Sequence, residues 1–206
     1  MADVVVQDAP VAERGRVPGP ISIAEFEIVP RKLLIFPAVT LAGLIAAIAS
    51  NSMWPLDFFH VVGGASWTIL DLFLGFVLGP ILGSLAIPGR IELTTKLMPK
   101  LLVIMPTVVT ATLAAGWQLG VVQGKVLTSY SHHGWVVASY IVVGVMAVIA
   151  LGLLEPANVA VLFELKKPRP NPQVIQRLMK RFIYCAGITG VMQIATLVIM
   201  TKIATS

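Results

Sequence analysis

Residues 58–87 have the sequence FFHVVGGASWTILDLFLGFVLGPILGSLAI, in which Asp71 is the single residue with a formal charge at neutral pH. At 1.5 Å per residue, a helix of this length is about 45 Å long, which exceeds the roughly 30 Å hydrocarbon core of a bilayer. A segment this long and this apolar predicts a tilted membrane-spanning helix.

The whole chain has the same apolar character. Of its 206 residues, 57% are hydrophobic and 12% are charged, and the mean hydropathy is +0.89. A soluble domain carries about a quarter of its residues as Asp, Glu, Lys or Arg, so this composition excludes a freely soluble protein. The single cysteine, Cys185, excludes a disulfide framework.

Four further stretches are long and apolar enough to cross a bilayer. Together with residues 58–87 they predict an all-α integral membrane protein with about five transmembrane helices. We expect four of them to form a bundle and the first to be an additional N-terminal helix. Residues 1–30 are expected to be a cytoplasmic tail, and residues 31–206 a single five-span domain. The four further stretches are residues 33–50, 101–122, 135–154 and 182–203.

The distribution of Lys and Arg predicts the orientation. Thirteen of the 15 basic residues lie before the first span, between the second and third, or between the fourth and fifth. Because cytoplasmic segments are enriched in basic residues, we expect a cytoplasmic N-terminus and an external C-terminus, in a prokaryotic plasma membrane. The thirteen are Arg14, Arg16, Arg31, Lys32, Arg90, Lys96, Lys100, Lys166, Lys167, Arg169, Arg177, Lys180 and Arg181.

One face of the second span carries polar residues and then glycines. His60, Gly64, Trp67 and Asp71 follow the helical spacing i, i+4, i+7 and i+11, and glycines at 75, 79 and 83 continue the line. Glycines at 116, 120 and 124 form a similar line in the third span. Such faces let a neighbouring helix or a flat ligand approach closely. The simpler interpretation is that the second and third spans pack through these glycines.

The ionisable residues within the spans are candidate functional groups. A charge at the centre of a membrane helix costs roughly 2.5–3.5 kcal/mol on insertion scales, so Asp71 must face protein or water. His60, His132 and His133 are all predicted at the outer side, where two imidazoles could ligate haem iron or copper. The alternative for His60 is a hydrogen-bonded interfacial histidine. Glu155 and Asn158 are expected to meet basic residues at the inner end, and Gln193 to form an interhelical hydrogen bond.

Two segments resemble a known group of membrane proteins. His60-Val-Val-Gly-Gly-Ala-Ser-Trp67 resembles the opening of the HemJ-type protoporphyrinogen oxidases and the related CopD-type proteins, and residues 106–116, PTVVTATLAAG, resemble their following helix. The resemblance spans about residues 58–203. It implies His60 as a haem b ligand. The lysine that this group carries in its next-to-last helix has no counterpart in residues 135–154, so no particular reaction is implied.

The resulting functional prediction is a haem b-binding, or copper-binding, membrane protein for electron transfer or porphyrin-linked redox chemistry. His60 would be one axial ligand and His133 or His132 the second, Trp67 and Gly64 would line the site, and Asp71 would tune its charge or relay protons. One alternative is a non-catalytic anchor subunit of a larger membrane complex. Another is a small transporter that uses Asp71. The expected partners are the lipid bilayer and other membrane subunits or further copies of the chain, and not nucleic acid.

Overall fold

The computed structural model describes residues 26–205, and every regular element in this part of the chain is a helix. Five helical segments are long and apolar enough to cross a membrane, as predicted. Two of the five contain a π-helical insertion. In chain order the elements are η3 (Arg31–Leu34), α1 (Ile35–Ser50), α2 (Met53–Leu72), η4 (Phe73–Leu78), α3 (Gly79–Ser84), α4 (Ile87–Val122), α5 (His133–Ile149), η5 (Ala150–Leu154), α6 (Glu155–Leu165) and α7 (Pro172–Ala204).

The helices are longer than the apolar stretches that predict them. The predicted connection after residue 87 is helical, because α4 begins at Ile87 and carries Arg90, Lys96 and Lys100 on its first turns. Likewise α6 continues to Leu165 and α7 begins at Pro172, where the side chain of Asn171 caps it. Hydropathy detects only the part of a helix that suits lipid, whereas Lys, Arg and Leu keep the polar ends helical. The predicted tail lies almost entirely outside the described residues.

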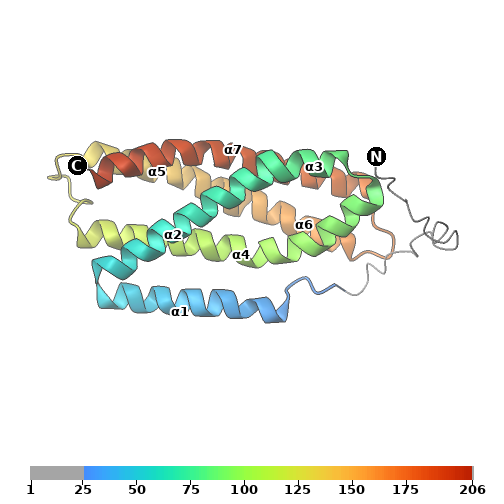
Figure 1. Cartoon of the computed structure of the whole chain (residues 1–206), viewed down its shortest axis with the longest axis horizontal. Coiled ribbons are helices and arrows are strands. Elements are labelled where there is room, and N and C mark those ends of the chain that lie inside the picture. Colours follow the sequence, from blue (N-terminus) through green and yellow to red (C-terminus); the bar gives the residue numbers. More distant parts are fainter. Residues whose placement is uncertain (1–25, 206) are drawn as a thin grey trace, which may run out of the picture.

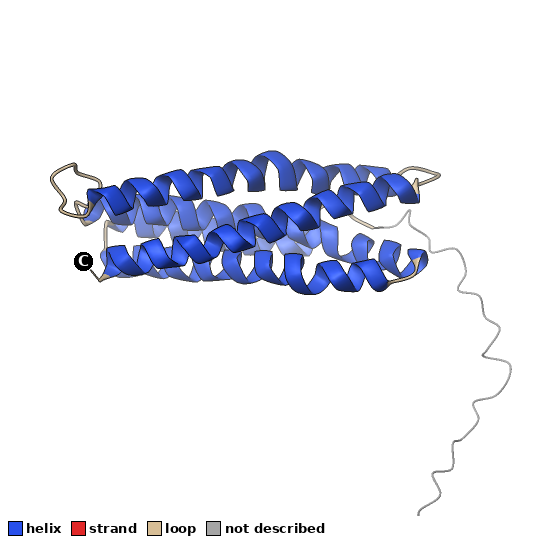
Figure 2. Cartoon of the chain, turned by 90° about the horizontal axis from the view of Figure 1, so that it is seen from above, coloured by secondary structure: helices blue, strands red, loops and turns tan. Residues whose placement is uncertain are grey.

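The second span crosses the bundle obliquely. It begins beside α1 and α4, and after η4 it ends beside α7 (Figure 1). The fourth span, α5–η5–α6, runs along α7, and α6 also contacts α4. Viewed from above, the helices lie roughly along one common direction (Figure 2). The start of α1 and the α3–α4 and α6–α7 connections therefore lie at one end, and the α1–α2 and α4–α5 connections lie at the other (Figure 1).

The main core is formed by four of the five spans. Trp67, Met98, Met146 and Phe182 belong to it, and each is at most 2% exposed. The first span contributes Leu44 and Ala47 to two small clusters with α2 and α4. Many large apolar side chains point outward instead, among them those of Ile35, Phe76, Val148 and Tyr184. Such an exterior suits contact with lipid rather than water.

The glycine faces pack differently from the simpler interpretation above. On α2, Gly63 meets Thr112 of α4, but Gly75 in η4 meets Gly187 of α7, and Gly79 meets Ile183 of α7. Because the second span is oblique, its glycine line leaves the third span and reaches the fifth. Within the third span, Gly116 meets His60, as the simpler interpretation expects. Gly120 instead meets Val126 and Tyr140, and Gly124 lies in the turn after α4 with φ of +67°.

Candidate functional site: a buried carboxyl group between two spans

Asp71 lies at the interface between α2 and α7 and is 1% exposed. The backbone at Asp71 is close to Gly190 of α7, where an added Cβ would come within 3.4 Å of the Asp71 carbonyl carbon. Both carboxyl oxygens are buried, and neither has a hydrogen bond to another described residue. The side chains of Trp67 and Thr189 lie beside the carboxyl group, outside the geometry of a normal hydrogen bond.

Other polar groups surround this carboxyl group. The hydroxyl group of Thr68, three residues earlier in α2, lies 2.8 Å from Gly64 O and 3.2 Å from Gln193 Oε1, so its single proton is shared between a bond within α2 and one to α7. The predicted interhelical bond of Gln193 is thus confirmed. The Gln193 Nε2 and Trp67 Nε1 atoms are buried without a partner among the described residues. We refer to Trp67, Thr68, Asp71, Thr189 and Gln193 as the Asp71 cluster. It holds more hydrogen-bonding capacity than its members use among themselves.

A π-helical segment adjoins the cluster. η4 begins two residues after Asp71, and η5 ends immediately before Glu155. Both segments pack against α7. π-Helical insertions are rare and are often found at functional sites, because they displace the helical hydrogen-bonding pattern. The irregular parts of two spans therefore both lie against the fifth.

Two buried polar residues of α7 were not singled out from the sequence. Thr189 and Thr196 are buried, and with Gln193 they form a polar stripe on α7 at intervals of four and three residues. That spacing marks one helix face, and it could have indicated which side of α7 meets a polar partner. It could not indicate that the partner is Asp71.

His60 is held between two spans. Its Nδ1 lies 3.0 Å from the carbonyl oxygen of Thr112 in α4. A carbonyl oxygen can only accept, so Nδ1 carries the proton and a neutral ring has its lone pair on Nε2. The ring also packs against Gly116, where an added Cβ would clash with Nδ1. Gly64 is nearby, in van der Waals range of the Thr112 methyl group.

The other two histidines are at the start of α5. His132 Nδ1 lies 3.0 Å from the Ser131 hydroxyl group, and His133 Nδ1 is buried without a described partner. No hydrogen bond or ring contact between described residues joins either of them to His60. α2 packs on α1, α4 and α7, whereas α5 packs on α7 and η5. Within residues 26–205 no group of three or more His, Cys, Asp or Glu side chains could hold a metal ion.

These residues therefore provide one suitable ligand for a haem or metal ion, and not two. His60 has the tautomer that a ligating histidine needs, since such residues usually donate their other ring N–H to a carbonyl or carboxylate group. No second ligand accompanies it in the described contacts. Trp67, 2% exposed, is packed in the main core beside Asp71.

The predicted inner-end network is not formed as expected. No ion pair between described residues joins Glu155 to Arg177, Lys180 or Arg181, and Glu155 Oε2 is buried without a partner. Asn158 reaches α4 instead: with its amide nitrogen toward Met98, it donates to Met98 O at 3.3 Å and accepts from Leu102 N at 3.1 Å. Because α4 is long and extends into this end of the bundle, its backbone, and not the basic residues, provides the partners of Asn158.

Comparison of the chain with protein-family models, with curated proteins and with solved structures found no match. The resemblance to the HemJ-type and CopD-type proteins thus stays a prediction from two short segments.

Proposed function

We propose that the five helical segments span a membrane with the start of α1 on the cytoplasmic side. The apolar exterior supports insertion, and the positions of the basic residues support the orientation. Eleven basic residues of the described chain belong to the α1 start or to the segments around the α3–α4 and α6–α7 connections, and Lys125 and Lys202 lie toward the opposite end.

The orientation predicts which connections are accessible from outside. In a Cys185→Ser background, Ser129→Cys in the α4–α5 connection should react with a membrane-impermeant maleimide added to intact cells, because Ser129 is exposed. Arg169→Cys in the α6–α7 connection should react only after the membrane is permeabilised. The reverse labelling pattern would contradict the orientation, and labelling of both in intact cells would contradict insertion.

We further propose that the protein is a small membrane transporter that carries protons, in which Asp71 binds and releases the transported proton. The observation that carries this proposal is the 1% exposure of Asp71 with no hydrogen bond to either carboxyl oxygen in the described structure. A buried carboxylate without a partner is costly, so the group is expected to hold a proton until a change in packing gives it water or a partner. Carboxyl groups inside spans commonly serve as proton relays.

The neighbouring groups support this role. The Trp67 and Gln193 N–H groups have no partner in the described structure. A rotation of the Trp67 side chain, or a small movement of α7 for Gln193, would let them donate to a carboxylate at Asp71. Gly190 lets the two backbones approach at this level. The π-helical η4 provides an irregular segment next to the site.

Infrared spectroscopy of the detergent-purified protein should detect a protonated carboxylic acid that disappears in Asp71→Asn. Asp57→Asn is the matched control, because Asp57 is an exposed carboxyl group on the same helix. In proteoliposomes with a trapped pH-sensitive dye, a pH gradient should drive proton entry that is lost in Asp71→Asn and kept in Asp57→Asn. Undiminished entry in Asp71→Asn would exclude Asp71 as the proton-binding group.

A second candidate is haem b ligation by His60, which the hydrogen bond between His60 Nδ1 and Thr112 O favours. A bound haem would supply one-electron redox chemistry. After expression with ample haem, purified protein should show a Soret band that is lost in His60→Ala. A colourless preparation would remove this candidate.

A stable multi-subunit complex that contains no chromophore and shows no proton entry would instead favour the function of a non-catalytic anchor subunit.

A further inference from the structure

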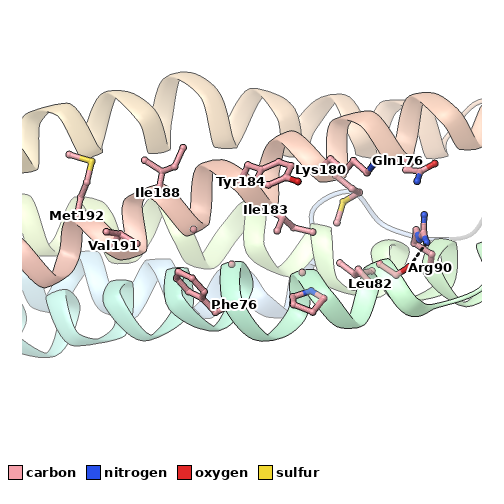
Figure 3. Close-up of a pocket in the computed structure, with 16 residues that line it drawn as sticks. Phe76, Leu82, Arg90, Gln176, Lys180, Ile183, Tyr184, Ile188, Val191 and Met192 are labelled. Carbon is pink, nitrogen blue, oxygen red and sulfur yellow. Dashed lines mark hydrogen bonds between the residues drawn. The ribbon is translucent and has the colours of Figure 1, made fainter.

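A groove runs along the outside of the bundle between the η4–α3 segment and α7 (Figure 3). Its volume is about 880 Å³, within the range of sites that enclose small ligands. Gly75, Gly79 and Gly83 form part of one wall, and Ile183 and Ile188 of α7 belong to the other. Most of the lining is apolar, so in a membrane the groove would receive hydrocarbon rather than water.

The polar lining residues gather at one end. Figure 3 shows Arg90 opposite Lys180 and Gln176 at this end, whereas Phe76, Val191 and Met192 are toward the other. The end with Arg90 is the end of the α3–α4 connection, because Arg90 belongs to the first turn of α4. In the orientation proposed above, this is the cytoplasmic leaflet.

Arg90 is fixed in place but has unused donors. Its Nη2 atom donates to the carbonyl oxygens of Gly83 at 3.2 Å and Leu85 at 3.1 Å, which satisfies the end of α3. Its Nε atom is buried and has no partner in the described chain. Its Nη1 atom also has no partner in the described chain and, unlike Nε, is not buried, so the planar guanidinium group presents an accessible donor at the mouth of the groove, a geometry suited to phosphate oxygens.

Lys180 adds a second positive charge across the groove. It is exposed on α7, and no carboxyl group of residues 26–205 forms an ion pair with it or with Arg90. Two other basic residues at this end, Lys96 and Lys167, do have acidic partners, Glu92 and Glu164. The groove therefore has an apolar lining along most of its length and, at one end, two positively charged side chains without an acidic partner among the described residues.

We propose that this groove binds one anionic phospholipid of the cytoplasmic leaflet. Its phosphate would lie between Arg90 and Lys180, and one acyl chain would lie along the apolar side chains that line the groove, such as those of Phe76 and Ile188. Basic pockets between spans on the cytoplasmic side are a known mode of anionic lipid recognition, because headgroup charge and chain direction are matched together. The inference rests on the proposed membrane insertion and orientation, and it does not depend on Asp71.

The full chain in nanodiscs of phosphatidylcholine with added phosphatidylglycerol tests the site. Native mass spectrometry after release into detergent should find one phosphatidylglycerol retained in preference to phosphatidylcholine. Arg90→Gln and Lys180→Gln should each weaken this retention about fivefold, which is the effect expected of one basic residue near an anionic lipid. Gly83→Leu should also weaken it, because Gly83 lines the groove and an added Cβ there meets nothing within 4 Å.

Matched controls separate the site from general effects. Arg177→Gln removes a positive charge, unpaired among the described residues, from the same end of the bundle but outside the groove, and Gly144→Leu adds the same side chain to an exposed position of α5, also with nothing within 4 Å. Both should keep the lipid. Arg90 also bonds the carbonyl oxygens at the end of α3, so Arg90→Gln could prevent folding. In that case Lys180→Gln and Gly83→Leu test the site without it. Equal retention of the two lipids, retention unchanged in Lys180→Gln and Gly83→Leu, or a dimer that occludes the groove would each overturn the proposal. A wrong orientation would appear separately in the maleimide labelling.

Discussion

Gly75→Ala is expected to destabilise the protein by about 1–3 kcal/mol, the usual cost of forcing extra atoms into a packed interface. A Cβ at Gly75 would come within 2.6 Å of the Gly187 Cα atom and 2.9 Å of its N atom. Both are backbone atoms, so no side-chain rotation can relieve the clash. α7 would have to move away from η4, and the contacts between these two segments would be lost.

The facing glycine provides the control. A Cβ at Gly187 would lie 3.8 Å from the Gly75 Cα atom, which is an ordinary van der Waals distance. Gly187→Ala should therefore be neutral, or slightly stabilising through its better helix propensity. Reversible unfolding in mixed detergent, followed by circular dichroism, measures both variants. Equal destabilisation by the two substitutions would mean that η4 and α7 are arranged differently.

Trp67→Ala is expected to cost about 3–5 kcal/mol of unfolding free energy, because it would leave a large cavity in the main core. Trp67 is 2% exposed and packs among residues of several spans. Its Nε1 atom has no hydrogen-bond partner in the described structure, so Trp67→Phe loses only part of the packing and should be markedly less costly.

Trp54 is the matched control, since it lies on the same helix but is 76% exposed. Trp54→Ala should change the unfolding free energy by less than about 0.5 kcal/mol in the same detergent unfolding experiment. If Trp67→Ala were as mild as Trp54→Ala, Trp67 would line an open site, as the haem prediction requires. If Trp67→Phe were as costly as Trp67→Ala, the indole N–H would carry a hydrogen bond in the folded protein.

The main features of the fold follow from the sequence because hydropathy is a property of each segment by itself. The five apolar helices are confirmed, and residues 58–87 alone indicate a span that must tilt. The helix ends could not be predicted in the same way. Residues 88–100 and 172–181 are polar enough to suggest connections, but they remain helical because Lys, Arg, Gln and Leu favour a helix in water as well as in lipid.

The candidate site was predictable only in part. The sequence indicates Asp71 as a candidate because placing a lone carboxyl group in an apolar segment costs free energy. The α7 residues that enclose it lie more than a hundred positions later in the chain, and the oblique course of the second span brings them beside it. The same crossing directs His60 toward Thr112 and Gly116 of α4.

The sequence by itself determines that the chain is helical, that five segments suit a bilayer, and that its positive charges are concentrated at one end. These properties depend on side-chain solubility and on position along the chain. Only the tertiary structure decides that Gly75 faces Gly187, that Asp71 is enclosed with Thr189 and Gln193, and that Arg90 and Lys180 stand at one groove. Those arrangements depend on the angle at which the second span crosses its neighbours, and that angle is set by packing of residues distant in the chain.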